Sequence, residues 1–179
     1  SEANPYQFIN ADIFAQAYAS YLVGLADVAL PDNHYDAPLY GFLMKSLDLI
    51  EEKIDMLVVT YIFELQVMSR FGAQLDFGQC VFCHRKDLPM DFSYKFNGCL
   101  CRNHFDADMR RSHLDPNVIF LCHSFMAIDL DKLPSINLSD DMKKKIRVFI
   151  DALYDHYIGV QIKAKKFIDG LDGWADIMK

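Results

Sequence analysis

The sequence predicts an all-α fold, a helical bundle into which a small zinc-binding hairpin is inserted. Through most of the chain, apolar residues recur every three or four positions, which is the period of an amphipathic helix. Residues 73–105 lack this period and carry cysteines and turn-forming residues instead. We therefore expect residues 1–72 to form the first part of the bundle, 73–105 the zinc-binding insert, and 106–179 the second part of the bundle.

Two helices are predicted at the start of the chain. The first covers about residues 10–30, and Asn10 or Asp12 can cap its N-terminus. The second begins after Asp36, a residue type that caps helices well, and a proline stands in its first turn. Both helices carry one apolar face, so both are expected to pack against a common core.

A third helix is predicted from about residue 55 to 71. It is apolar nearly all round, which is typical of a helix buried on most of its sides. Glu64 is its conspicuous carboxylate, and we expect it either to pair with a nearby arginine, with Arg70 as a possible partner, or to cap a backbone group. Gly72 follows and suits the C-terminal cap.

Two further helices are predicted after the insert. Asp115, followed by a proline, begins a helix that ends near Ile128. Ser139 caps a long final helix with one apolar stripe. A further segment, 162–171, either continues this helix or packs separately after a bend at Gly159.

The insert carries a Cys-x2-Cys-x17-Cys-x2-His pattern, formed by Cys80, Cys83, Cys101 and His104. A two-residue gap lets a tight turn point both side chains of a pair at one metal ion. Three thiolates and one imidazole are a typical donor set for zinc. Because four protein ligands complete a tetrahedral shell, the sequence predicts a structural zinc site rather than a catalytic one.

Other ligand assignments are open at this stage. Cys99 can replace Cys101, and either His84 or His113 can replace His104. Cys122 lies in an apolar helix and is expected to be an ordinary buried thiol. A redox pair is disfavoured because the first knuckle is flanked by loop-like residues rather than by a strand and a helix.

Composition limits the class of protein. Of 179 residues, 52% are hydrophobic, which is enough for a substantial core. No apolar stretch is long enough to span a bilayer, and the N-terminus does not resemble a signal peptide. The sequence thus predicts a cytoplasmic protein without a membrane segment.

Charge is distributed unevenly. The net charge is −7, and residues 1–69 hold 10 acidic and 2 basic residues, whereas residues 70–179 hold 15 acidic and 16 basic residues. Contacts with phosphates or with an acidic peptide are therefore expected in the second part. The candidate basic residues are Arg110, Arg111, Lys143, Lys144, Lys145, Arg147, Lys163, Lys165 and Lys166.

Motifs of catalysis are not found. The sequence has no phosphate-binding glycine-rich loop, no nucleophile elbow and no zinc-protease helix. Phe92, Tyr94 and Phe96 alternate within the insert, so one side of that segment can be exposed for base stacking. We therefore expect a binding protein rather than an enzyme.

The junction between the third helix and the insert resembles that of the RecO family of bacterial recombination mediators. The matching residues are Phe63-Glu64-Leu65, Gly72 and Leu75-Asp76, which precede Cys80-Val81-Phe82-Cys83. The segment 97–101 is similar to the Gly-Gly-x-x-Cys of the family, and 154–167 is similar to its terminal helix. Asn97 stands where a glycine is usual, and His104 stands where a cysteine is usual; both are chemically tolerable.

The resemblance implies a function and a set of partners. Proteins of this family begin with an OB-fold of roughly 80 residues. The strands of that fold are missing here, so the chain resembles the helical and zinc portion alone. It implies binding to single-stranded DNA (mainly through the OB-fold), to RecR and to the acidic, apolar C-terminal tail of the single-strand binding protein. These contacts help RecA to load on DNA in the cytoplasm, at the nucleoid. A zinc-stabilised protein–protein adaptor that does not bind DNA is the alternative.

Overall fold

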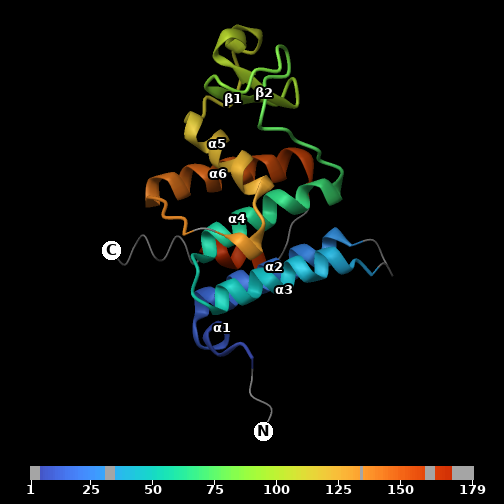
Figure 1. Ribbon diagram of the computed structural model, residues 1–179. Coiled ribbons are helices and arrows are strands. Elements are labelled where there is room, and N and C mark those ends of the chain that lie inside the picture. The colour runs from blue at the N-terminus through green and yellow to red at the C-terminus, as the bar shows by residue number, and fades with distance from the viewer. Residues whose placement is uncertain (1–4, 31–34, 134, 160–163, 171–179) are drawn as a thin grey trace.

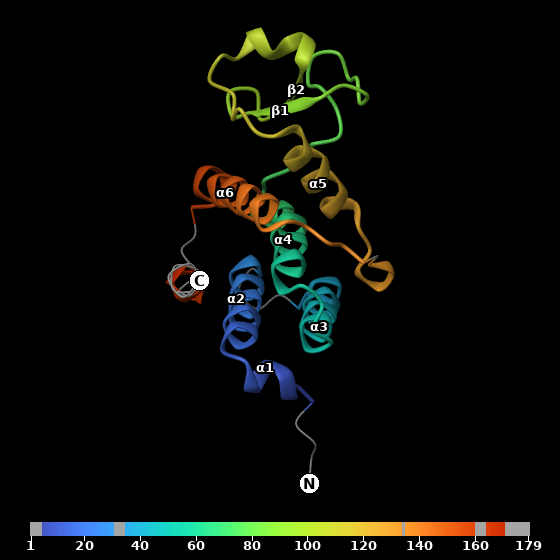
Figure 2. The same cartoon turned by 90° about the vertical axis from the view of Figure 1, so that its left-hand side faces the viewer.

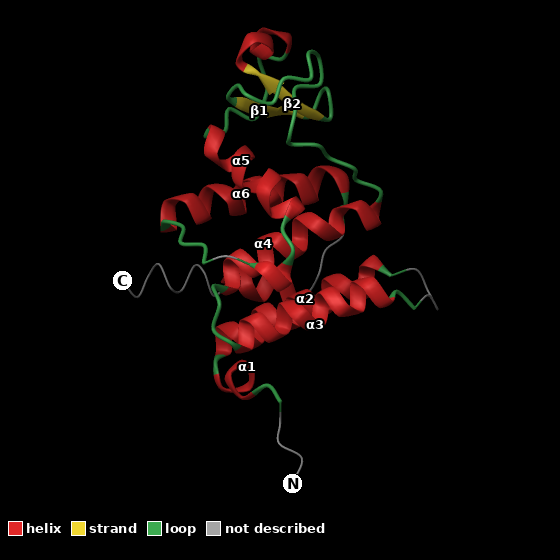
Figure 3. Ribbon diagram, in the orientation of Figure 1, coloured by secondary structure: helices red, strands yellow, loops and turns green. Residues whose placement is uncertain are grey.

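The predicted all-α architecture is confirmed by the computed structural model, which describes residues 5–30, 35–133, 135–159 and 164–170. Helices stack on one another, and a small two-stranded sheet stands at one end, far from the N-terminus (Figures 1, 2 and 3). In chain order the elements are α1 (Gln7–Ala11), α2 (Ile13–Ala29), α3 (Ala37–Glu51), α4 (Met56–Val67), η1 (Met68–Phe71), β1 (Met90–Ser93), β2 (Gly98–Cys101), η2 (Arg102–Ala107), α5 (Pro116–Ala127), η3 (Leu130–Lys132) and α6 (Asp140–Tyr157).

Side-chain caps fix where the long helices begin. Asp12 rather than Asn10 caps α2, because its carboxylate accepts the backbone N–H groups of residues 14 and 15. Asp36 caps α3 through the N–H of Leu39, and Ser139 caps α6 through the N–H of Met142. Each cap satisfies a backbone donor that the first turn of a helix leaves without a partner.

Helix α4 lies at the centre of the bundle, as its apolar sequence predicts. It contacts α2, α3, α5 and α6, and every residue from 58 to 65 is buried. The ring of Phe63 stacks on Phe42 of α3, with 4.9 Å between centroids. The 3₁₀ turn η1 ends at Gly72, whose φ of 84° suits a residue without a side chain.

Strands β1 and β2 form an antiparallel hairpin. Met90 pairs with Cys101 and Ser93 with Gly98, so the four residues of each strand are matched in register. The segment after the hairpin stays with it, because the N–H of Ser112 donates to the carbonyl of Phe92 at 2.8 Å. We refer to residues 73–115 as the hairpin module.

The hairpin module shares a core with the bundle. Phe77 and Phe92 of the module meet Phe149 of α6, and the three rings pack edge to face at centroid distances of 5.5 to 5.8 Å. Such aromatic contacts add to the burial of apolar surface. The module therefore rests on α5 and α6 and is not an independent appendage (Figure 2).

The expected pairing of Glu64 with Arg70 is wrong. Glu64 is fully buried and pairs with Arg147 of α6, whereas Arg70 is exposed at the end of η1 and pairs with Asp36. The side chain of Glu64 is enclosed between α2 and α6, where Tyr21 and Arg147 reach it, whereas Arg70 lies in η1 beyond the end of α4. Gly159 has a φ of 65° just after α6, and residues 164–170 are helical, in accordance with the predicted bend.

Candidate metal centre

Four side chains of the hairpin module converge on one point. Ligand atoms of Cys80, Cys83, Cys101 and His104 all lie within 4.8 Å of one another. The Sγ atoms of Cys83 and Cys101 are 3.7 Å apart, and His104 Nδ1 lies 3.5 Å from Cys80 Sγ and 3.3 Å from Cys101 Sγ. The structure thus brings together the four residues of the sequence pattern.

Short backbone hydrogen bonds form the first knuckle. The N–H of His84 donates to the carbonyl of Cys80 at 2.9 Å, and the N–H of Cys80 donates to the carbonyl of Arg85 at 3.0 Å. Val81 donates to the carbonyl of Cys99 at 2.9 Å, which ties the knuckle to β2. His84 takes a left-handed conformation, with φ of 57°, which closes the turn.

The donor set fits a tetrahedral metal ion. For Zn–S bonds of about 2.3 Å and Zn–N bonds of about 2.05 Å, tetrahedral geometry places two thiolates about 3.8 Å apart and a thiolate and an imidazole nitrogen about 3.5 Å apart. The measured separations of 3.7, 3.5 and 3.3 Å agree with these values. The cluster can therefore hold a metal ion with all four positions filled by protein.

The surroundings of Cys80 favour a thiolate. Burial raises the pKa of its thiol, but backbone N–H groups of Cys101, Cys83 and Phe82 point at the sulfur, and the balance lowers the pKa to about 6. Hydrogen bonds of this kind stabilise a metal-bound thiolate and orient it. The knuckle therefore supplies both the ligand and its supporting donors.

The alternative ligands are not part of the cluster. Cys99 is fully buried in the hydrophobic core, where burial raises the pKa of its thiol, and Cys122 is likewise buried. His84 is exposed, and Nε2 of His113 donates to the carbonyl of Met109. Among the residues that the structure describes, none of these four joins the metal-binding group.

The candidate basic residues do not gather in one patch. Arg147 is taken up by the buried Glu64, and Arg111 pairs with the buried Asp91 at 3.0 Å while its guanidinium covers the ring of Phe105. Both cations therefore form ion pairs with buried carboxylates of the protein itself.

The lysines on and after α6 are also largely paired. Lys143 pairs with Asp55, Lys145 with Asp115 and Asp141, and Lys165 with Asp151 and Asp169. Arg110, Lys144 and Lys166 are exposed, and Lys163 lies outside the described residues.

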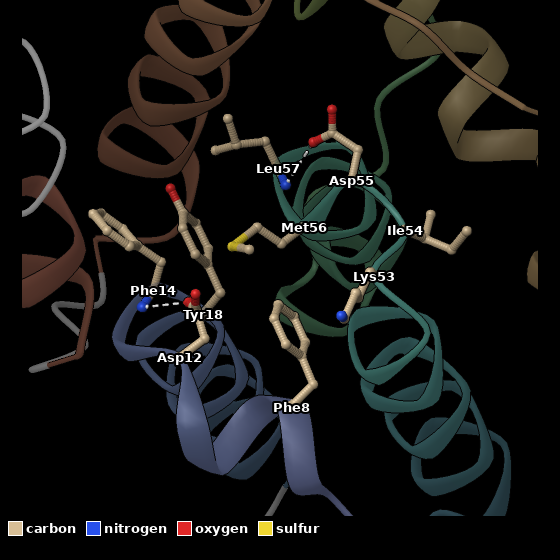
Figure 4. A pocket seen from close by; sticks show the side chains of 9 residues that line it. All are labelled: Phe8, Asp12, Phe14, Tyr18, Lys53, Ile54, Asp55, Met56 and Leu57. Atoms are coloured by element: carbon tan, nitrogen blue, oxygen red, sulfur yellow. Dashed lines mark hydrogen bonds between the residues drawn. The ribbon is translucent and has the colours of Figure 1, made fainter. Parts of the chain in front are cut away.

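A pocket that could not be predicted from the sequence lies at the end of the bundle opposite the hairpin module. Phe8 of α1 and Phe14 and Tyr18 of α2 face Met56 and Leu57 at the start of α4 (Figure 4). The remaining lining residues are Asp12, Lys53, Ile54 and Asp55. The pocket is mainly apolar, and its two carboxylates cap α2 and α4.

Lys53 brings a positive charge to this pocket. Its Nζ lies 5.1 Å from the centroid of the Phe8 ring, and the side chain is exposed. Its φ of 63° is in the left-handed region, where glycine is the usual residue after a helix. Hydrophobic periodicity carries no information on the backbone conformation of a single residue, so this position could not be predicted from the sequence.

Among the described residues, no helix combines the length and the apolar character needed to cross a lipid bilayer. The fold and the site define the class of protein: a helical bundle that carries a small hairpin with a Cys/His cluster able to hold a metal ion.

Comparison with known proteins identifies the family. A model described as "Recombination protein O C terminal" matches residues 10–166. DNA repair protein RecO of Lactococcus lactis subsp. cremoris (strain MG1363) is 59% identical over the whole chain, which covers 71% of that protein. DNA repair protein RecO of Streptococcus pyogenes serotype M49 (strain NZ131) is 52% identical with the same coverage. No solved structure matches the chain. The chain belongs to the RecO family of DNA repair and recombination proteins.

Proposed function

We propose that this chain is the helical, zinc-bound portion of a recombination mediator that acts by binding and not by catalysis. It helps RecA to load on single-stranded DNA through contacts with the single-strand binding protein, RecR and DNA. Membership of the RecO family and the closed ligand cluster carry the proposal. A four-ligand site leaves no position for a substrate, so the metal acts on structure.

The metal of the proposal is zinc, held by Cys80, Cys83, Cys101 and His104. Its donor set of three sulfur atoms and one nitrogen atom, the inter-ligand distances and the N–H groups directed at Cys80 support this choice. The ion joins the two knuckles and so holds the hairpin module in shape. Residues 73–105 form the proposed zinc insert between the two parts of the bundle, 1–72 and 106–179.

Metal content and thiol reactivity test the zinc site directly. The purified chain is expected to contain one zinc per molecule, and chelation is expected to release three reactive thiols. Cys99 and Cys122 are buried and should react only on unfolding. A metal-free protein with freely reactive thiols at the start would contradict the assignment.

The pocket beside Lys53 is the proposed site for the acidic, apolar tail of the single-strand binding protein. Its apolar walls can take the apolar side chains, and Lys53 can pair with a carboxylate at the mouth (Figure 4). Lys53 has a left-handed backbone conformation that glycine would adopt without strain. That a residue with a side chain stands there supports a functional role for this side chain. Lys143 pairs with Asp55 on the pocket wall and so offsets one of the two negative charges of the lining.

A fluorescent peptide with acidic residues followed by an apolar C-terminus tests this pocket. Lys53→Ala is expected to weaken binding by roughly tenfold, as loss of one charge-assisted contact does. Lys45→Ala is the matched control, because Lys45 is the other lysine of residues 1–69, pairs with Asp131 and does not line the pocket of Figure 4. Equal affinities of the two variants would place the tail elsewhere.

Localisation in the cytoplasm, at the nucleoid, follows from this proposal. The alternative function, a zinc-stabilised adaptor that binds proteins only, differs in one measurable respect. With an N-terminal OB-fold attached to the chain, a titration with single-stranded DNA across salt concentrations separates the two: the adaptor should not bind DNA, whereas the affinity of the mediator should fall as salt rises because of its phosphate contacts.

A further inference from the structure

The first knuckle exposes apolar side chains that the core does not use. Val81 is 37% exposed and Phe82 is 47% exposed, although both stand between the metal ligands Cys80 and Cys83. Phe96, in the turn of the hairpin, contacts Phe82 and is only partly buried. We refer to Val81, Phe82 and Phe96 as the knuckle patch.

The knuckle patch is held rigidly by its neighbours. The ring of Phe82 lies edge-on to Phe96, with 4.9 Å between centroids, and 5.4 Å from the ring of His104. Val81 packs against Gly98, where an added Cβ atom would lie 2.6 Å from its Cγ1. A partner therefore meets aromatic surface that is already ordered, which lowers the entropic cost of binding.

Positive charges lie close to the knuckle patch, in space for Lys95 and along the chain for Lys86 and Arg102. Lys95 places its Nζ 4.8 Å from the centroid of the Phe96 ring and donates to the carbonyl of Ala107. Lys86 and Arg102 are exposed, and neither forms an ion pair within the described part of the chain. Residues 79–105 contain four basic and two acidic residues, in contrast to the acidic first part of the chain.

Most of the nearby acidic residues already bind other groups of the protein. Asp91 is buried and accepts the backbone N–H groups of residues 113 and 114, and Asp108 is buried and accepts the hydroxyl of Ser93. Asp87 pairs with Arg85. A zinc ion with three thiolates adds a single negative charge, so the stretch 79–105 stays positive.

We propose that the knuckle patch, with Lys86, Lys95 and Arg102, is a contact surface for single-stranded DNA. Bases stack on Phe82 and Phe96, and the three cations meet the phosphates. Exposed aromatic rings beside lysine and arginine are the combination that binds single strands without sequence preference. This inference rests on the proposed function and deepens it, because it adds a DNA contact on the hairpin module itself.

Charge favours DNA over a protein partner. A purely apolar protein surface would gain nothing from three flanking cations, whereas a single strand offers both phosphates and unpaired bases. The position of the hairpin module at one end of the molecule leaves room for an extended strand (Figure 1). An acidic peptide shares the negative charge and is therefore included in the test.

Fluorescence anisotropy on the zinc-loaded chain tests the proposal. The probe is a labelled oligothymidylate of about 20 nucleotides, which is longer than one stacking site. Phe82→Ala is expected to weaken binding roughly tenfold, with an unchanged salt dependence, because one stacking contact is lost. Phe120→Ala is the control, since Phe120 is 66% exposed on α5 outside the knuckle patch, and it should bind like the wild type.

The cations have a separate readout. Replacing Lys86 and Arg102 together by glutamine is expected to reduce the slope of log affinity against log salt by about 1.4, the effect of two phosphate contacts on a single strand. Both residues are exposed, so this variant should fold and retain zinc even if Phe82→Ala does not. Phe82→Leu keeps the apolar volume without a ring, and it should also bind DNA more weakly.

The possible results distinguish failure of the knuckle contact from failure of the proposed mediator function. A wild-type chain that binds DNA, with affinities unchanged in all knuckle variants, would overturn the knuckle contact and leave the mediator role standing. A chain with no DNA affinity at all would overturn the knuckle contact, whereas the mediator role, whose DNA binding is expected mainly from an OB-fold, would still be tested by its protein contacts. Loss of binding to an acidic apolar peptide in Phe82→Ala, with DNA binding intact, would assign the knuckle patch to a protein partner and overturn the proposal.

Discussion

Arg147 on α6 donates two hydrogen bonds to the carboxylate of Glu64 on α4, at 2.7 and 3.0 Å. Glu64 is fully buried and also accepts the hydroxyl of Tyr21 on α2 at 2.5 Å. Arg147 extends the network to Asp151 at 2.8 Å, and the hydroxyl of Tyr154 donates to the carbonyl of Glu64. One carboxylate thus connects three helices at the centre of the bundle.

Removal of either charge of this pair is expected to be costly. Glu64→Leu leaves the guanidinium of Arg147 without its main partner in a buried site, and a loss of about 3–5 kcal/mol in unfolding free energy follows. The double variant Glu64→Leu with Arg147→Met should recover most of that loss, because no buried charge stays unpaired. Urea denaturation measures both.

Lys145→Ala serves as the comparison for this network. It removes ion pairs with Asp115 and Asp141 that are partly exposed, and its effect should stay below about 1 kcal/mol. A single Glu64 variant as mild as Lys145→Ala would show that the buried pair does not contribute as the geometry implies.

The positions of the helices could be predicted from the sequence, but the partner of Glu64 could not. Periodicity and caps such as Asp36 and Ser139 are local signals, and they locate helix ends well. Which helix packs on which face depends on contacts between segments more than 80 residues apart, as for Glu64 and Arg147. A single sequence holds no direct signal of such a contact, so the nearby Arg70 was the wrong choice.

Loss of a metal ligand is expected to unfold the hairpin module locally. Cys80→Ser or Cys101→Ser removes a thiolate, and a site of three remaining donors should lose its zinc. The helices should persist, since α2, α3 and α4 pack on each other without the hairpin, although Phe149 loses its contacts with Phe77 and Phe92. Metal analysis and circular dichroism measure the two effects.

Cys99→Ala is the informative control for the ligand assignment. Cys99 is buried beside the site but lies in the hydrophobic core, so its replacement should leave zinc bound. Retention of zinc by Cys101→Ser together with its loss in Cys99→Ala would reverse the assignment of those two residues.

The four residues of the candidate metal centre follow from their spacing, whereas the binding surfaces around it do not. Cys80, Cys83, Cys101 and His104 form two pairs of fixed separation, and a knuckle places each pair at one point. Clusters of basic residues in the sequence do not predict a surface patch, because carboxylates from distant segments pair with several of these residues, as Asp55 does with Lys143. Exposure of Phe82 depends on the folded hairpin and had no local signal.

Acid is expected to loosen the N-terminal helix through Glu51. Its carboxylate accepts the N–H of Phe8 at 2.8 Å and of Ile9 at 2.9 Å, and these bonds lower the pKa of Glu51 below its usual value. The stabilisation is therefore present above the unfolded pKa of about 4.3 and disappears as the pH falls through the lower folded pKa.

Hydrogen exchange of the α1 amides as a function of pH measures this effect. Wild-type protection at residues 8 and 9 should fall in acid, whereas Glu51→Gln should show weaker protection and little dependence on pH in that range. Glu52→Gln is the control, because Glu52 is exposed and forms no hydrogen bond to α1 within the described residues. Identical profiles for wild type and Glu51→Gln would rule out the role of this carboxylate.

Two glycines are expected to respond in opposite ways to alanine. At Gly98 an added Cβ atom would lie 2.6 Å from Cγ1 of Val81, so Gly98→Ala should push the first knuckle away from β2. Since Val81 stands between Cys80 and Cys83, we expect weaker zinc retention and a loss of about 1–3 kcal/mol in stability.

Gly41 lies within α3, and an alanine side chain there meets no atom within 4 Å. Gly41→Ala should therefore stabilise the protein by about 0.5–1 kcal/mol, because alanine loses less backbone entropy in a helix. Chelator titration followed by thermal unfolding compares the two variants. Equal zinc retention in Gly98→Ala and Gly41→Ala would mean that the contact between Val81 and β2 does not position the metal ligands.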